Sequence, residues 1–126
     1  SAPQYKIDCE KEKVEVMGNP GPLKQALMNV MINAAQAIDG KGFIKLTVID
    51  AAQSVTIKIL DSGCGIPAKH LKRIFEPFFT TRSDGTGLGL YIARELCEVN
   101  NIRLAPMNSN EGCCFQLLFR TGDNRD

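Results

Sequence analysis

Residues 83–90 read Ser-Asp-Gly-Thr-Gly-Leu-Gly-Leu, and residues 91–98 continue as Tyr-Ile-Ala-Arg-Glu-Leu-Cys-Glu. Glycine occupies every second position from 85 to 89, and the continuation has the apolar spacing of an amphipathic helix. Backbone N–H groups at a helix N-terminus, with no Cβ atoms in the way, can bind an anion such as phosphate. Nearby hydroxyl and guanidinium groups can add donors: Thr80, Thr81, Thr86, Arg73 and Arg82.

Four interpretations of this glycine-rich stretch compete. A dinucleotide-binding fingerprint requires Gly-x-Gly-x-x-Gly directly after a buried strand. The sixth position counted from Gly85 is Leu90, and residues 80–84 do not read as a strand. A P-loop requires Gly-x-x-x-x-Gly-Lys-Ser/Thr, which does not occur in the sequence. An atypical phosphate site and a plain flexible loop before a helix therefore remain open.

Outward from this loop, hydrophobic periodicity assigns the remaining elements. Helices are predicted over about 21–38, 68–74 and 87–99, and strands over 5–9, 14–17, 43–49, 54–60, 102–106 and 113–119. Asn19 with Pro20 marks the start of the first helix, and Asp39-Gly40 marks its end. This order of strands and helices predicts a two-layer α/β sandwich.

Composition limits the function classes. The 126 residues are 44% hydrophobic and 23% charged, which predicts one domain over 1–126, ordered over about 5–120. A formal net charge of +1 is not the excess of positive charge that nucleic-acid binding requires, and no apolar run has the length of a membrane span. Five cysteines, one histidine and no Cys-x-x-Cys argue against zinc and favour reduced thiols. Because residue 1 is Ser rather than Met, we expect a fragment or a processed chain.

The first predicted helix carries carboxamides where a solvated face usually carries charge. One face, expected to pack on the sheet, holds Leu23, Leu27, Val30, Ala34 and Ile38; the opposite face holds Gln25, Asn29, Asn33 and Gln36. The Asn33 oxygen is a candidate Mg²⁺ ligand with Asn29 beside it, because magnesium favours oxygen and often uses few protein groups together with phosphates. The alternative is a helix whose amides are covered by another domain.

Two further segments also have a functional and a purely structural interpretation. Asp61 ends a predicted strand, where its carboxylate can accept a hydrogen bond from an amino group of a ligand. Gly63 and Gly65 leave room for a flat ligand to come close. The alternative there is an ordinary turn. Residues 75–79 hold three of the six phenylalanines, which either anchor the core or form the hinge of a loop that closes over a ligand.

Four segments, taken in order, resemble the N, G1, F and G2 boxes of sensor histidine kinases. These segments are Asn29-x-x-x-Asn33-Ala, Asp61-x-Gly-x-Gly, Phe75-Glu-Pro-Phe-Phe and Gly85-Thr-Gly-Leu-Gly-Leu. The kinases belong to the superfamily that includes gyrase B, Hsp90 and MutL, and the resemblance covers roughly residues 5–120. Glu-Pro-Phe-Phe-Thr-Thr-Arg is similar to the nitrogen-regulation (NtrB) class, and the segment after Gly89 with the Cys-Cys-Phe strand resembles PilS-like sensors of type IV pilus genes.

The resemblance implies a mixed, mostly antiparallel sheet of about five strands, covered on one face by about three helices. ATP·Mg²⁺ would lie between the first long helix and a mobile lid loop. By position, Asp61 would hold adenine and Asn33 would ligate the metal. The implied catalytic residues are Asn29, Arg73 and Arg82. The implied nucleotide-binding residues are Asn33, Asp61, Gly63, Gly65, Ile66, Phe75, Thr80, Thr81, Gly85, Thr86, Gly87, Leu88 and Gly89.

Some positions depart from the family pattern. Gln36 and Ala37 stand where Lys and Tyr are common, and Arg82 stands where Lys is frequent. Residues 100–107 lack the usual His-Gly-Gly. In the gyrase, Hsp90 and MutL branch, a Glu four residues before the magnesium Asn is the general base for water. Here that position is Asn29, which cannot take a proton at neutral pH, so we expect phosphoryl transfer to a histidine rather than efficient hydrolysis.

The expected partners follow from the same resemblance. His70 is not followed by a carboxylate, and the histidine-containing dimerisation hairpin is absent from this chain. We therefore expect ATP, the dimerisation domain of the same kinase and a downstream response regulator as partners, with no nucleic acid and no direct membrane contact. The domain would lie in the cytoplasm, as part of a membrane-anchored sensor. The alternatives are a gyrase-like ATPase, a non-catalytic nucleotide-binding module suggested by Gln36 and Ala37, and a protein-serine kinase of the anti-sigma type.

Overall fold

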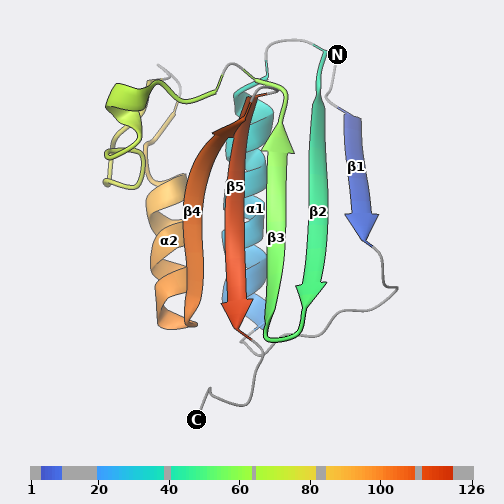
Figure 1. The fold of residues 1–126 in the computed structure, drawn as a ribbon. Coiled ribbons are helices and arrows are strands. Elements are labelled where there is room, and N and C mark those ends of the chain that lie inside the picture. Colours follow the sequence, from blue (N-terminus) through green and yellow to red (C-terminus); the bar gives the residue numbers. More distant parts are fainter. Residues whose placement is uncertain are drawn as a thin grey trace.

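The computed structural model describes residues 4–9, 20–38, 41–63, 65–81, 85–109 and 112–120. The elements in chain order are β1 (Gln4–Cys9), α1 (Pro20–Gln36), β2 (Phe43–Ala51), β3 (Ser54–Asp61), the 3₁₀ turn η1 (Ala68–His70), α2 (Gly89–Val99), β4 (Ile102–Ser109) and β5 (Gly112–Arg120). Five strands form one sheet in the order β1-β2-β3-β5-β4, and both α-helices lie behind the same face of it (Figure 1). The predicted two-layer α/β sandwich is confirmed.

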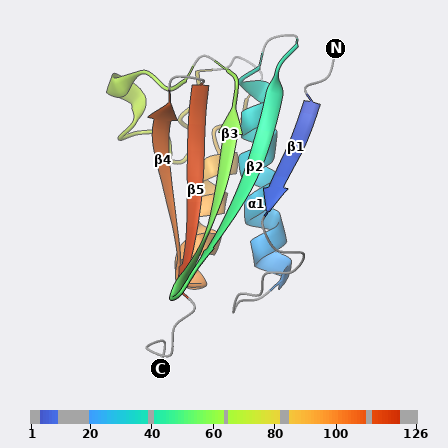
Figure 2. The same cartoon turned by 45° about the vertical axis from the view of Figure 1, so that its right-hand side comes forward.

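Strand pairing makes the sheet mixed but mostly antiparallel, as expected. β1 pairs in parallel with β2 at one edge, and the other neighbours are antiparallel. The strands twist across the sheet, as seen when the molecule is turned (Figure 2). β3 is the central strand with β5 beside it, and their register places the end of β3, Asp61, opposite Cys113 near the start of β5.

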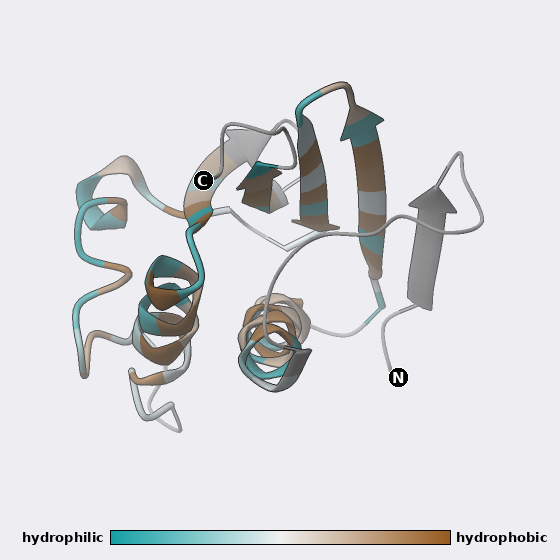
Figure 3. Cartoon of the chain, turned by 90° about the horizontal axis from the view of Figure 1, so that it is seen from below, coloured by the Kyte–Doolittle hydropathy of each residue, from teal (hydrophilic) through white to brown (hydrophobic). Residues whose placement is uncertain are grey.

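The core lies between the sheet and the two helices, which run side by side beneath it (Figure 3). On α1 the fully buried positions are Ala26, Val30 and Ala34, whereas Leu23 and Leu27 are partly buried. Val30 and Ala34 of the expected apolar face are therefore fully buried, as predicted, but the centre of the buried face of α1 is shifted toward Ala26. The shift arises because α1 contacts α2 as well as the sheet, so the buried arc includes a position that periodicity assigned to neither face.

The segment after β3 differs from the prediction of a helix over 68–74. Only Ala68–His70 is helical, as one 3₁₀ turn, and the chain then continues in turns. Its backbone hydrogen bonds link residues three apart, such as Arg73 N–H to the His70 carbonyl at 2.8 Å. Its N-cap residue is Pro67, which provides no side-chain cap. A segment this short gains too few hydrogen bonds to offset the cost of its first turn, so it does not extend into an α-helix.

The other predicted elements agree with the structure to within a few residues. α2 begins at Gly89, two residues after the predicted start, and ends before Asn101, which adopts a left-handed φ of 58°. The predicted strand at 14–17, the helix boundaries at Asn19 and Asp39-Gly40, and Arg82 lie outside the described residues. Within the described part of the chain, neither helix is long and apolar enough to cross a membrane.

Candidate functional site

Asp61 is the fully buried charged side chain among the described residues, with 0% of its surface exposed. Its Oδ1 accepts a hydrogen bond from the Gly63 N–H at 2.8 Å, whereas Oδ2 has no hydrogen-bond partner among the described residues. Burial raises the pKa of the Asp61 carboxyl, and hydrogen bonds from the backbone of Gly63 and Cys113 lower it in part. An unsatisfied buried acceptor costs about 1–3 kcal/mol. The structure therefore holds an acceptor that fits an N–H group of a ligand.

Two glycines allow three segments to meet around this carboxylate. A Cβ on Gly63 would lie 2.5 Å from the Ala37 carbonyl oxygen and 2.9 Å from Asp61 Oδ1. A Cβ on Gly112, whose φ is 151°, would lie 2.1 Å from the Asp61 carbonyl oxygen. The residue after α1, the end of β3 and the start of β5 are therefore in direct contact. Gly63, which sequence reasoning linked to space for a flat ligand, is also required for this close packing.

Helix α1 connects the Asp61 region to the start of α2. Asn29, Asn33 and Ala37 follow one another at intervals of four residues, so they lie along one line of the helix. Asn29 Nδ2 donates to the Gly89 carbonyl at 3.2 Å, and Ala37 contacts Gly63 as described above. Asn33, between them, is half-buried, and its carboxamide makes no hydrogen bond within the described residues. The amides at 29 and 33 thus line the side of α1 that borders both predicted ligand segments.

The four predicted amides do not behave alike. Gln25 and Gln36 are exposed, whereas Asn29 and Asn33 are half-buried. Gln25 Nε2 donates to Asn29 Oδ1 at 2.9 Å, which fixes the carboxamide of Asn29 so that its nitrogen faces Gly89. Gln25 is a supporting residue that the sequence did not single out for a role of its own.

The glycine-rich loop is closed at its base by Phe78 and Gly87. The Phe78 N–H donates to the Gly87 carbonyl at 2.8 Å. Gly87 has φ of 75°, and a Cβ there would lie 2.3 Å from the Phe78 carbonyl carbon, so glycine is required. Thr86 Oγ1 accepts from the Leu88 N–H at 3.2 Å just before α2 begins. Around Gly89, by contrast, there is open space.

The phenylalanines near this loop divide into two groups. Phe75 and Phe79 pack against the core, and the Phe75 ring meets Phe115 edge to face at 6.2 Å between centroids. Phe78 is 73% exposed and has a left-handed φ of 70°, so its backbone rather than its ring holds the loop base. The core interpretation therefore applies to two of the three rings. Ile66 also packs against the core, where it is partly buried.

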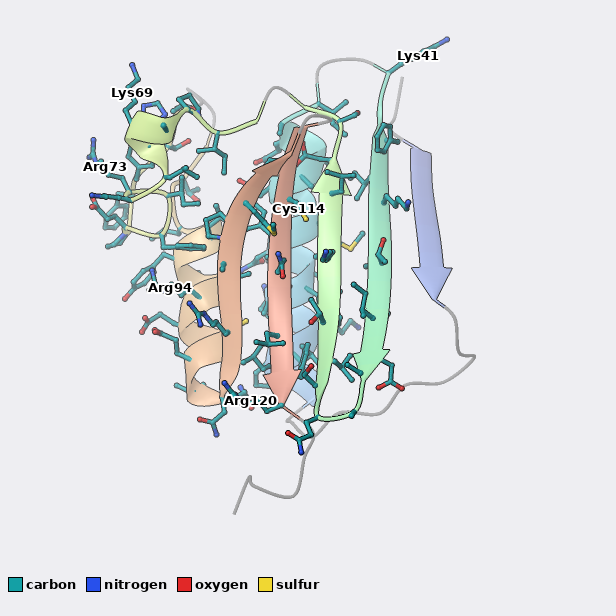
Figure 4. The ribbon with its side chains drawn as sticks, in the orientation of Figure 1. Lys41, Lys69, Arg73, Arg94, Cys114 and Arg120 are labelled. Carbon is teal, nitrogen blue, oxygen red and sulfur yellow. The ribbon has the colours of Figure 1, made fainter. Side chains whose placement is uncertain are left out.

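The predicted phosphate donors are not gathered in one place. Arg73 is exposed, with Nε 3.5 Å from Glu76 Oε1 and its guanidinium 4.6 Å from the Phe79 ring centroid. It lies on the outer edge of the 68–79 segment, away from α1 (Figure 4). Thr80 and Thr81 are exposed, and Gly65 and Gly85 are half-buried. The structure brings together Asn29, Asp61, Gly63 and Gly89 through α1, but it leaves Arg73 outside this group.

A separate groove of about 390 Å³ opens on another side of α1. The described part of its lining is Met28, Met31, Ile32, Ala35 and Gln36. Met28, Ile32 and Gln36 are exposed, whereas Met31 and Ala35 also pack against the core. The groove offers no charged side chain among its described lining residues, so we assign the candidate site to Asp61 and the amide side of α1 instead.

Comparisons with known proteins identify the family and the fold. The profile of the family described as "Histidine kinase-, DNA gyrase B-, and HSP90-like ATPase" matches residues 18–123. The sensor protein kinase PilS of Pseudomonas aeruginosa is 42% identical over a match 113 positions long, which covers 84% of this chain and 21% of that protein. The chain thus spans about a fifth of the length of this curated relative.

Two solved structures of the histidine kinase ThkA have a similar fold. Its nucleotide-free catalytic domain matches with a TM-score of 0.86 and 32% identity, over 94% of this chain and 79% of that one. ThkA in complex with the response regulator protein TrrA matches with a TM-score of 0.83 and 27% identity, over 98% of this chain and 36% of that one. Both similarities extend over nearly the whole length of the present chain.

Proposed function

Because the chain belongs to the histidine kinase-, DNA gyrase B-, and HSP90-like ATPase family, we propose that it binds Mg-ATP and transfers the γ-phosphoryl group to a histidine on a separate dimerisation domain. The observation that carries the proposal is Asp61 Oδ2, a buried acceptor with no donor in the part of the chain that the structure describes. The exocyclic amino group of adenine supplies such a donor. Guanine carries a carbonyl oxygen at the same position, so the carboxylate also provides a physical reason for choosing adenine.

The phosphate end of the nucleotide is proposed to lie along α1 toward the start of α2. Asn33 would hold Mg²⁺ through its carboxamide oxygen, which has no hydrogen bond within the described chain. Bound Mg²⁺ would neutralise part of the phosphate charge. The N–H groups at the start of α2 would face the phosphates. The Asn29 bond to Gly89 supports this arrangement, because it holds the amide side of α1 against the first residue of α2.

The remaining proposed contacts follow the same division between base and phosphates. Around the base we place Gly63, Gly65, Ile66 and Phe75; near the phosphates we place Thr80, Thr81, Arg82, Gly85, Thr86, Gly87, Leu88 and Gly89. Arg73 is proposed to reach the terminal phosphates after leaving Glu76. An exposed ion pair of this kind contributes about 0–1 kcal/mol, so its rupture is a small barrier to that movement.

Transfer to a protein acceptor is favoured over hydrolysis by Asn29. Its oxygen accepts from Gln25 and its nitrogen donates to Gly89, and a carboxamide cannot remove a proton from water at neutral pH. Positioning and charge neutralisation would then carry the reaction. The complex of ThkA with TrrA supports a response regulator as the downstream partner of the whole kinase. We further propose that this domain lies in the cytoplasm as part of a longer, membrane-anchored sensor. The coverage of only 21% of PilS, which is named a sensor protein kinase, supports a longer protein.

The test uses the chain, Mg-ATP labelled in the γ-phosphate, and the histidine-containing dimerisation domain of the same kinase. We expect ATP to raise the thermal unfolding midpoint, because a ligand that binds the native state stabilises it by about 2.7 kcal/mol at a hundred times its Kd. We also expect label on the acceptor histidine, and roughly 10- to 150-fold less label with Asp61→Asn at subsaturating ATP. No thermal shift at millimolar ATP would contradict nucleotide binding. Rapid phosphate release without acceptor would instead support a hydrolase, and binding without labelling would support a non-catalytic module.

A further inference from the structure

Cys113 lies directly opposite Asp61 in the β3–β5 ladder. Directly opposed residues of an antiparallel pair project to the same face of the sheet, with Cβ atoms about 4.5–5.5 Å apart. Cys113 is 3% exposed and belongs to the core face with Phe115 and Leu117. The thiol of Cys113 therefore lies beside the Asp61 carboxylate on the side of the sheet that faces α1.

An independent observation indicates that a ligand reaches this place. Asp61 Oδ2 is buried without a donor, so a group that bonds it must enter between α1 and the inner face of the sheet. Gly112 has no side chain and packs on the carbonyl oxygens of Asp61 and Gly63. Cys113 is then the first side chain of β5 next to this acceptor, and a flat base bound to Asp61 comes within contact distance of its sulfur.

We propose that Cys113 is a site of covalent modification inside the base pocket, at which a low-molecular-weight disulfide blocks nucleotide binding. This inference rests on the proposed function. The Cys113 thiol gives its proton to solvent, and the thiolate attacks one sulfur of the disulfide. A new S–S bond joins Cys113 to that half of the reagent, the old S–S bond breaks, and the other half leaves as a thiolate. Excess thiol reverses the reaction by the same exchange.

Two other described cysteines provide internal controls. Cys114 follows Cys113 but lies on the opposite face of β5, in front of the sheet in the view of Figure 4, so an adduct there does not occupy the base pocket. Cys97 is 1% exposed on the buried side of α2, and burial raises its pKa to about 11. Its reaction therefore reports on opening of the core rather than of the pocket.

The experiment treats the Cys114→Ser chain with 2-hydroxyethyl disulfide and follows adducts by peptide mass spectrometry, so that an adduct on β5 belongs to Cys113. ATP at about ten times its Kd leaves roughly a tenth of the protein free, so labelling of Cys113 should slow about tenfold while Cys97 is unaffected. The labelled protein should lose its ATP-induced rise in unfolding midpoint, and dithiothreitol should restore it. In the Cys113→Ser chain the reagent should not abolish that rise.

The outcomes separate this inference from the proposed function. If unmodified protein shows no thermal shift with ATP, nucleotide binding itself fails, and ATP also leaves the labelling of Cys113 unchanged. If ATP binds but does not protect Cys113, or if the Cys113 adduct still binds ATP, the modification site is wrong while the proposed function stands. Absence of an adduct at Cys113, or labelling only at the rate of Cys97, also overturns the inference.

Discussion

Replacement of Asp61 by Asn should convert the acceptor that faces the nucleotide base into a donor. Asp61 Oδ1 already accepts the Gly63 N–H at 2.8 Å, and a backbone hydrogen bond from Cys113 also reaches the carboxylate. In Asp61→Asn the amide oxygen should keep the Gly63 bond, because the amide nitrogen cannot accept it. The amide nitrogen then takes the place of Oδ2 and presents N–H to the amino group of adenine.

The size of the effect follows from the bond that is lost. A hydrogen bond to a charged acceptor contributes about 1.5–3 kcal/mol, which corresponds to a roughly 10- to 150-fold weaker affinity for ATP. The free energy of unfolding of the free protein should not fall at pH 7, because the substitution also removes a carboxylate that burial destabilises. The preference for ATP over GTP should narrow, since the new N–H can donate to the carbonyl oxygen of guanine.

Isothermal titration calorimetry with ATP and with GTP measures the affinities, and urea unfolding measures the stability. Asp50→Asn is the matched control, because Asp50 is an exposed aspartate near the far end of β2; it should bind ATP as the unmodified chain does. Unchanged ATP affinity in Asp61→Asn, in a chain that does bind ATP, would refute the assignment of Oδ2 to the base. A large loss of stability with normal folding of the control would show that the carboxylate is structural instead.

Three further predictions concern the loop, the pH dependence and the core. Gly87→Ala should weaken ATP binding and destabilise the loop closure between Phe78 and Gly87, because the new Cβ would meet the Phe78 backbone at 2.3 Å with φ at 75°. Gly89→Ala, in open space at the first residue of α2, should leave the free energy of unfolding unchanged or raise it by up to about 1 kcal/mol. Urea unfolding and ATP titration compare the two variants. The pKa of Asp61 is raised above 3.8, so its contribution to the free energy of unfolding is fully present below that value and is lost as pH rises through the folded-state pKa. The stability of the unmodified chain relative to Asp61→Asn should therefore decrease as pH rises from about 4, and the opposite trend in urea unfolding would contradict the burial of this carboxyl. Ile59→Val, at a 0% exposed site of β3, should lower the free energy of unfolding by about 0.5–1.5 kcal/mol, whereas a change near zero would indicate a loosely packed core.

Local pattern predicted most elements because the residues that form them act over short distances. The spacing of apolar residues located α1 and α2, and the alternation of apolar and polar residues located β2 and β3 on either side of the turn that joins them. The contribution of Ala26 was not visible, because periodicity does not reveal that α1 has two neighbours. The helix predicted over 68–74 is reduced to one 3₁₀ turn, because a short segment without a capping side chain gains too few hydrogen bonds to offset the cost of its first helical turn.

The site was only partly predictable, since its decisive features are nonlocal. Sequence order identified Asp61, Asn29 and Asn33, but not the unpartnered Oδ2, which depends on how α1, β3 and β5 pack together. The position of Cys113 beside Asp61 follows from a register between strands about fifty residues apart, and no local signal encodes it. The family resemblance placed Arg73 near the phosphates of the nucleotide, whereas its side chain contacts Glu76 and Phe79 in the structure.

The central claim is that one pocket, bordered by α1, the end of β3 and the start of α2, binds the whole nucleotide. Amide chemical-shift mapping during a titration of the ¹⁵N-labelled chain with Mg-ATP tests this most directly. We predict that the backbone amides of Asn33, Gly63 and Gly87 shift together along one saturable curve, while Lys45 and Lys58 of the outer sheet face stay unchanged. Shifts confined to one of the three segments, or centred on the groove around Met28 and Ile32, would contradict the claim.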